Sequence, residues 1–282
     1  MPKTTKVRSH PILSMAMANL DAWVHSPRTI FMLIFTILLC YLEVYKLMVQ
    51  VNGNGWAMNL AETPYKFLEY GVNIYMSSIL VFVMISELPR KLPYQNYMLI
   101  RSNRKKWMTA QILYSFLIVI AVLLLILLCI LLFSALYTDF GSGWTDPARI
   151  ASGSMQAEHA LVPQYVREHF VPFTAIFYAA LPLFFFWFSL AMIILLCSLL
   201  GSQQAGLIIC AFALLAHFVG AYDTLFYPVK YATISGLSLE EFGPERYWYT
   251  LAGYIILNAT MILTMYWRVS RTDLVFYSEN KI

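Results

Sequence analysis

The segment from Glu87 to Thr109 concentrates more positive charge than any other part of the chain, and the types and spacing of its residues suggest docking chemistry. Six of its residues are basic and one, Glu87, is acidic. The basic residues are Arg90, Lys91, Arg101, Arg104, Lys105 and Lys106. Solvated charge of this kind is typical of a loop that marks the cytoplasmic side of a membrane protein.

The middle of this basic bridge has a second feature that charge alone does not require. Pro93 to Ile100 is compatible with a short helix, because proline fits the first helical position. On that helix Tyr94, Tyr97 and Met98 would share one stripe, three and four residues apart. An aromatic and apolar stripe beside the basic residues predicts a surface that contacts another protein.

A second group of residues could do hydrolytic chemistry. The segment Glu240-Glu241-Phe242-Gly243-Pro244-Glu245-Arg246 resembles the paired-glutamate motif of intramembrane CAAX-type proteases, in which two carboxylates activate a water. Here the arginine comes one residue late, a Gly-Pro pair interrupts the helix, and no suitably spaced histidine follows. The spacing therefore disfavours one catalytic helical face.

Other motifs of catalysis or metal binding are missing from the sequence. It has no G-x-x-x-x-G-K-[ST] loop, no H-E-x-x-H and no C-x-x-C, and its five histidines are scattered. Among the histidines His217 alone falls in an apolar run, where packing is favoured over proton relay. The four cysteines also lie in apolar runs, which favours packing over disulfides. We therefore expect no catalytic residue, no metal and no cofactor on this chain.

The elements around these residues belong to a membrane protein. Hydrophobic residues make up 60% of the chain and charged residues 12%, and several apolar runs exceed the ~18 residues that mark a transmembrane helix. We predict an all-α integral membrane fold with six transmembrane helices, within a transmembrane domain over 29–268. The predicted spans are 29–49, 67–86, 108–136, 172–200, 205–222 and 247–267. Cytoplasmic segments are predicted at 1–28 and 269–282.

An amphipathic interfacial helix is predicted ahead of the first span, over Pro11 to His25. Its apolar residues recur at helical spacing. These residues are Leu13, Ala16, Met17, Leu20 and Val24. Trp23, at the edge of the stripe, is expected at the level of the lipid headgroups, so the whole helix should lie in the membrane interface.

Four further expectations concern the spans and their connections. Glu43 and Lys46 are one turn apart near the end of the first span and should pair with each other. The short reversal after residue 200 predicts that the fourth and fifth spans are antiparallel neighbours. Between the fifth and sixth spans, the broken apolar segment 223–246 predicts re-entrant helices covered by protein. The polar segment 137–171 is expected outside the membrane, as a gate or as a partner-binding cap.

The charge distribution predicts the orientation of the chain. The terminal segments and the basic bridge together carry thirteen basic and four acidic residues. The positive-inside rule therefore places both termini and the bridge in the cytoplasm, which fits an even number of spans.

This layout resembles the permease subunits of ABC-2 type ATP-binding cassette transporters over essentially the full chain. The resemblance rests on the amphipathic helix, the six spans, the basic bridge between the second and third spans, and the re-entrant pair. Its most specific part is the sequence PYQNYMLIRSNRKKWMTAQ from Pro93 to Gln111, which is similar to the bridge of many bacterial members. The external segment is longer than in compact members of the family.

The resemblance implies a function and a set of partners. In such transporters the bridge holds a coupling helix that sits in a groove of a separate ATPase subunit, and two permeases join two ATPases. It implies ATPase contacts at Tyr94, Gln95, Tyr97, Met98 and Arg101, with ATP and Mg on the partner ATPase. The second permease would be the same or a paralogous chain, in the bacterial cell membrane.

We therefore expect a permease subunit of an ATP-driven exporter. The spans hold few charged residues, which favours a hydrophobic or amphipathic cargo such as a peptide, lipid or drug. Two other functions remain open at this point: an intramembrane hydrolase, and a non-transporting membrane sensor or immunity subunit. An associated ATPase would favour the transporter.

Overall fold

The computed structural model describes residues 11–53, 57–89, 103–141, 143–145, 162, 164–215, 228–234, 237 and 243–271, and in this part of the chain the fold is all-α. Its longer helices are α1 (Pro11–Val24), α2 (Pro27–Gly53), α4 (Gly71–Ile85), α6 (Arg104–Ser134), α9 (Pro172–Leu199), α10 (Gln203–Leu215) and α12 (Glu245–Arg271). The shorter ones are α3 (Glu62–Glu69), α8 (Gln164–His169) and the 3-10 helix η1 (Pro228–Ala232).

Four of these helices, α2, α6, α9 and α12, are long and apolar enough to cross a membrane, and the bent pair α3–α4 makes a fifth if it is counted as one span. The chain therefore has the character of a multi-pass membrane protein. The predicted fifth span, 205–222, is represented by α10, which has 13 described residues; 216–222 lie outside the described part. Six complete spans thus remain a prediction.

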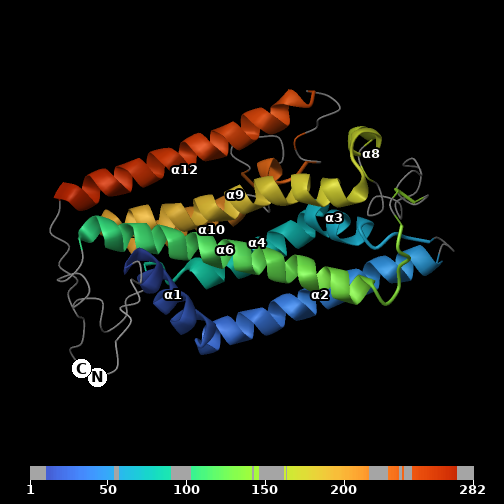
Figure 1. Ribbon diagram of the computed structural model, residues 1–282, viewed down its shortest axis with the longest axis horizontal. Helices are drawn as coiled ribbons and strands as arrows, with labels where there is room; N and C mark the ends of the chain where they lie inside the picture. Colours follow the sequence, from blue (N-terminus) through green and yellow to red (C-terminus); the bar gives the residue numbers. More distant parts are fainter. Residues whose placement is uncertain are drawn as a thin grey trace, which may run out of the picture.

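The long helices run along one axis in alternating directions (Figure 1). α6 starts at the end of the bundle where α9 and α12 finish, and α1 lies at this same end. Arg104, Lys105 and Lys106 open α6, and Arg268 and Arg271 close α12. The described basic residues of the predicted cytoplasmic segments thus gather at one end of the bundle.

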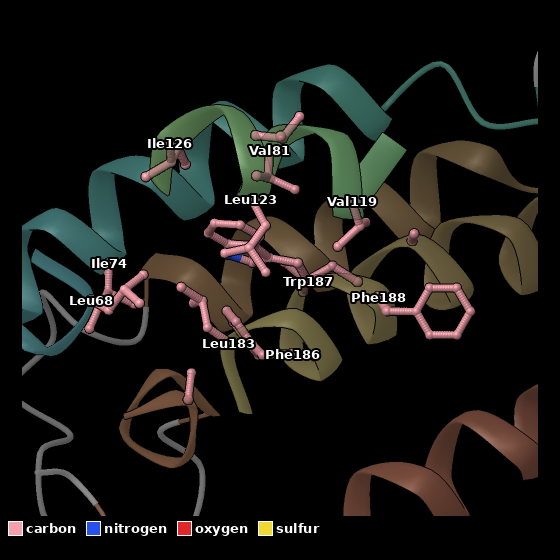
Figure 2. Close-up of a cluster of buried hydrophobic side chains, with 14 of the residues drawn as sticks. Leu68, Ile74, Val81, Val119, Leu123, Ile126, Leu183, Phe186, Trp187 and Phe188 are labelled. Carbon is pink, nitrogen blue, oxygen red and sulfur yellow. The ribbon is translucent and has the colours of Figure 1, made fainter. Parts of the chain in front are cut away.

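α9 is the central helix. It packs against α3, α4, α6, α10, α12 and η1. Of the 18 residues in its most apolar stretch 61% are buried, compared with 17% for the same stretch of α2 and 22% for that of α12. Trp187 in its middle is fully buried. Figure 2 shows this indole beside Leu123 of α6, with Val81 of α4 above and Leu183 of α9 close by. Trp187 therefore lies in the core that α4, α6 and α9 share.

The predicted antiparallel pairing of the fourth and fifth spans is confirmed for α9 and α10. The reversal between them uses Gly201, whose φ of 105° suits glycine. Four residues into α10, a Cβ added to Gly206 would lie 2.9 Å from Cβ of Cys197 and 3.0 Å from Cα of Ile194. The absence of a side chain at Gly206 is what allows the two backbones to approach so closely.

The helix predicted over Pro11 to His25 is present as α1 (Pro11–Val24), and its position in the membrane interface stays a prediction. α1 packs on α6 and buries Met15, Ala16, Asn19 and Trp23, with Trp23 only 4% exposed. The Trp23 ring packs inside the protein, and its predicted level at the lipid headgroups stays a prediction. Leu13, Met17 and Val24 stay exposed, so α1 has one face for α6 and a second apolar face.

The predicted second span, 67–86, is interrupted. α3 ends at Glu69 and α4 begins at Gly71, and the two helices are bent by 77°. At the junction Tyr70 has an extended backbone with ψ of 114°. The apolar helix that follows this elbow is therefore α4, which is shorter than the predicted span.

Two loops at the α3 end of the bundle are joined to each other. Leu60 N donates to the carbonyl of Asp139, and Asp139 N donates to the carbonyl of Met58, at 3.0 and 3.2 Å. The amide of Asn59 donates to the carbonyls of Gly141 and Gly143. The described start of the segment predicted to be external thus lies on the residues that lead into α3. The re-entrant pair predicted over 223–246 is represented by η1 alone, since most of this segment lies outside the described residues.

Candidate functional site: a polar cavity at the α3–α4 elbow

A cavity of about 130 Å³ lies between α2 and the elbow of α3 and α4. One wall comes from α2 and the other from the two helices that meet at Tyr70. The lining residues are Glu43, Val44, Lys46, Leu47, Thr63, Lys66, Phe67, Tyr70, Val72 and Asn73. Two lysines and one glutamate thus lie around a small space.

The charged residues on the α2 wall form an ion pair. Lys46 Nζ lies 2.6 Å from Glu43 Oε1, as their spacing predicts. The Lys46 side chain is 66% exposed and that of Glu43 only 13%. The pair thus neutralises Glu43 inside the rim of the cavity and leaves Lys46 at its opening.

Lys66 on the opposite wall is different, because it is buried without a hydrogen bond. Lys66 is only 6% exposed, and its Nζ has no hydrogen-bond partner among the described residues. A buried ammonium without a bonded counter-charge costs roughly 3–5 kcal/mol relative to a paired one. Such a group makes the cavity a place where a negatively charged oxygen would be stabilised.

Glu62 stands one turn before Lys66 but is engaged elsewhere. Its carboxylate accepts hydrogen bonds from the backbone N–H and the hydroxyl of Thr145, the latter at 2.9 Å. This contact joins the start of α3 to the described residues that follow α6. Burial lowers the pKa of Lys66 to about 8, and the Glu62 carboxylate acts in the opposite direction.

Two neutral groups add hydrogen-bonding capacity to the cavity wall. Thr63 Oγ1 and Asn73 Oδ1 are both buried, with no hydrogen-bond partner among the described residues. The hydroxyl of Thr63 can donate a hydrogen bond, as can the ammonium of Lys66. Together with Asn73 on α4, these unsatisfied groups make the elbow wall polar.

The elbow is held in place by contacts from distant parts of the chain. Glu69 Oε1 accepts a 3.0 Å hydrogen bond from the backbone N–H of Ile234, next to η1. Tyr70 N closes α3 on the carbonyl of Lys66 at 3.0 Å. On the other face, the ring of Tyr65 packs edge-on to Trp144, with centroids 5.5 Å apart. The contacts of Tyr65, Glu69 and Tyr70, on either side of Lys66 in the sequence, therefore fix its position.

At the opposite end of the bundle, both ends of the basic bridge are attached to other helices. Arg28, at the start of α2, donates to Ser86 Oγ at 2.5 Å and lies 3.5 Å from Glu87 Oε1. Gln203, at the start of α10, donates to the carbonyls of Ser86 and Leu88, both at 2.9 Å. The bridge therefore leaves α4 from a point tied to α2 and α10.

The bridge re-enters the bundle at α6, where Asn103 accepts a hydrogen bond from Lys105 N at 3.1 Å and so caps the helix. Arg104, Lys105 and Lys106 then follow in the first turn. Cations at a helix N-terminus are unfavourable for the helix dipole. Helix stability therefore does not explain this cluster.

The residues predicted to contact an ATPase, Tyr94, Gln95, Tyr97, Met98 and Arg101, lie outside the described residues. The same holds for His217, Glu240 and Glu241. Gly243 is described, and its φ of 81° places it in the left-handed region just before α12. Gly243 is thus not helical, as the Gly-Pro pair predicts.

Sequence reasoning did not single out Lys66, Thr63 or Asn59. A signal was present in ETPYKFLE, residues 62–69, where Glu62, Lys66 and Glu69 recur at helical spacing. Such a pattern is typical of an exposed polar helix, whereas this one is buried along nearly all its length.

Within the described residues no group of three or more His, Cys, Asp or Glu side chains could hold a metal ion. The chain matches no protein-family model, no curated protein and no solved structure.

Proposed function

We propose that this chain is the permease subunit of an ATP-driven exporter of the ABC-2 type. It would move a hydrophobic or amphipathic cargo with energy from a separate ATPase subunit, in a bacterial cell membrane, with both termini and the basic bridge cytoplasmic. The observation that carries the proposal is the attachment of the bridge: Gln203 and Arg28 join its first residues to α10 and α2, and Asn103 joins its last residues to α6.

This attachment suits transmission of force. A displacement of the bridge would act directly on the ends of α4 and α6, and through Arg28 and Gln203 on α2 and α10. α4 and α6 both pack on the central helix α9, so the movement would reach the core. ATP can shift such an equilibrium only by binding its own subunit differently in the two states of the complex.

The helix α1 supplies a second route for the same coupling. It packs on α6 near the first residues of that helix (Figure 1), and its exposed apolar residues Leu13, Met17 and Val24 face away from the bundle core. An ATPase bound at the bridge would therefore lie close to α1.

The decisive experiment replaces the aromatic stripe of the bridge. The double variant Tyr94→Asp and Tyr97→Asp should insert normally but lose copurification with the ATPase subunit and lose ATP-driven transport. The matched control is Tyr137→Asp, which changes a half-exposed tyrosine just after α6 at the opposite end of the bundle. Full coupling in the double variant would overturn the proposal.

Topology is a separate test. Single cysteines at Lys105 and at Thr145, at the two ends of the bundle, should react with a membrane-impermeant maleimide from opposite sides in a background where the four native cysteines are replaced. We expect Lys105→Cys to be labelled only from the cytoplasm. Labelling of Lys105→Cys from outside intact cells would exclude an ATPase contact at the bridge.

A further inference from the structure

The cavity at the elbow stands apart from the bridge, and its chemistry is not required by the proposed function. It lies beside Glu62 and Lys66 of α3, at the end of the bundle opposite Arg28, Ser86 and Gln203. At about 130 Å³ it is smaller than the ~300–1,000 Å³ of sites that enclose a drug-sized ligand. It cannot enclose a whole amphipathic cargo, yet it has room for several waters or for one small polar group.

We infer that this cavity binds one oxyanion group, a phosphate or a carboxylate, on the ammonium of Lys66. Lys66 lines the cavity and is only 6% exposed. Its Nζ has no hydrogen-bond partner among the described residues. The Thr63 hydroxyl lies on the same wall and is likewise unsatisfied. An oxyanion between these two donors would form charge-assisted hydrogen bonds, which are among the strongest in proteins.

The charge of the walls favours an anion over a cation or a neutral group. Glu43 is already paired with Lys46 at 2.6 Å, and Glu62 accepts two hydrogen bonds from Thr145. Lys66 is therefore the charge of the cavity lining left without a bonded partner in the described structure. A cation would face two lysines, and a neutral ligand would leave the ammonium uncompensated.

The position of the opening indicates how an anion could enter. The residues at the rim are exposed: Lys46 has 66% of its side chain accessible, and Val72 is 45% exposed. Lys46 belongs to α2 and Val72 to the first turn of α4, on a lateral face of the bundle. A lipid headgroup could enter from the side, and a soluble phosphate or carboxylate could enter from the water at the loop end.

Binding is measured on the full chain in detergent with three probes. These are inorganic phosphate, acetate, and phosphatidylglycerol added at increasing molar ratio, with phosphatidylcholine as the zwitterionic comparison. Thermal unfolding reports soluble anions and native mass spectrometry reports lipids. We expect one saturable equivalent per chain of at least one anionic probe and no saturable binding of phosphatidylcholine.

The variants separate a site from general attraction of anions. Lys66→Met keeps the side-chain length without the charge and should weaken binding at least tenfold. Lys105→Met removes an equal charge from the exposed start of α6 and should leave the affinity within twofold. Val72→Trp fills the rim without touching the lysine and should also block binding, which keeps the test informative where Lys66→Met fails to fold.

Each outcome decides one point. Saturation by phosphate or acetate alone identifies a soluble oxyanion, and saturation by phosphatidylglycerol alone identifies a lipid headgroup; both support the site. Equal binding by wild type and by the folded Lys66→Met or Val72→Trp variants, or no saturable binding by any probe, overturns it. Loss of the ATPase contact in the bridge variant leaves these results unchanged, so the two proposals fail independently.

Discussion

The indole Nε1 of Trp187 donates a 2.8 Å hydrogen bond to Ser78 Oγ, with both residues fully buried. The bond joins α9 to α4 in the centre of the bundle, where lipid and water are both excluded. Ser78 lies on the helix that leads to the basic bridge, so this contact links the core to the part of the chain where we propose that force enters.

Removing this bond should destabilise the protein by a modest amount. Hydrogen bonds between transmembrane helices contribute about 0.6 kcal/mol on average and up to about 1.7 kcal/mol. A double-mutant cycle of Ser78→Ala and Trp187→Phe, followed by unfolding in detergent, should give a coupling free energy in this range. The cycle removes the effect of the smaller ring from the result. A coupling near zero would show that the bond adds nothing beyond packing.

Gly206 should tolerate no side chain, unlike Gly253. Gly206→Ala places a methyl group 2.9 Å from Cβ of Cys197, and overpacking of this kind costs roughly 1–3 kcal/mol. Gly253, in α12, has nothing within 4 Å of an added Cβ, so Gly253→Ala should be neutral or stabilise by up to about 1 kcal/mol through helix propensity. Thermal unfolding of both variants checks the difference. Equal destabilisation of the two would contradict the close α9–α10 approach.

Gln203 should matter for coupling more than for folding. Gln203→Ala removes the hydrogen bonds to the carbonyls of Ser86 and Leu88, which should cost about 1–3 kcal/mol for the groups left unsatisfied. Given the proposed function, it should also raise ATP turnover without raising transport. The control is Gln164→Ala on α8, whose side chain donates to Glu168 within the same helix. Unchanged coupling in Gln203→Ala, with the bond loss visible as lower stability, would assign this residue a structural role only.

Lys66 should make stability depend on pH in the ligand-free protein. Its pKa in the folded chain is about 8, below the 10.5 that is ordinary for lysine. Below pH 8 both the folded and the unfolded states carry the proton, and the full pKa difference then opposes folding. As pH rises from about 8 to about 10.5, the folded state loses its proton first and stability increases, by on the order of 3 kcal/mol. Other charges near Lys66 are Glu43 and Lys46 from α2 and Glu62 and Glu69 from α3.

The measurement is the difference in unfolding temperature between wild type and Lys66→Met across this pH range. Because Lys66→Met lacks the titrating group, wild type should gain on the variant as pH rises from 8 to 10.5. A difference that is constant with pH would mean that Lys66 is not held in a desolvated environment.

Several parts of the fold follow from local patterns that the sequence displays directly. The apolar runs predict α2, α6, α9 and α12, because a single apolar segment of this length satisfies its own backbone hydrogen bonds inside a membrane as a helix. The pairing of Glu43 with Lys46 follows from their spacing on one helix. The α9–α10 hairpin follows from a reversal too short for any other arrangement.

The parts that could not be predicted depend on residues far apart in the chain. Residues 67–86 form one apolar run, and the elbow within it is held by contacts such as the bond from Ile234 to Glu69, 165 residues away. Trp23 is of a residue type common at membrane interfaces. Its burial depends on the packing of α1 against α6. Lys66 was not singled out for the same reason, because helices distant in the sequence, such as α9, pack against α3 and bury it.

The elbow also changes how the bilayer must meet this side of the protein. α4 has 15 residues, which gives a length of about 22 Å at 1.5 Å per residue, whereas the hydrocarbon core of a typical membrane is about 30 Å thick. If α4 alone crosses the bilayer, acyl chains beside Val72 and Met76, both exposed, compress or tilt along this wall. A thin, fluid patch of membrane at one flank is a built-in property of such a protein, and short-chain lipids will suit it better than long ones.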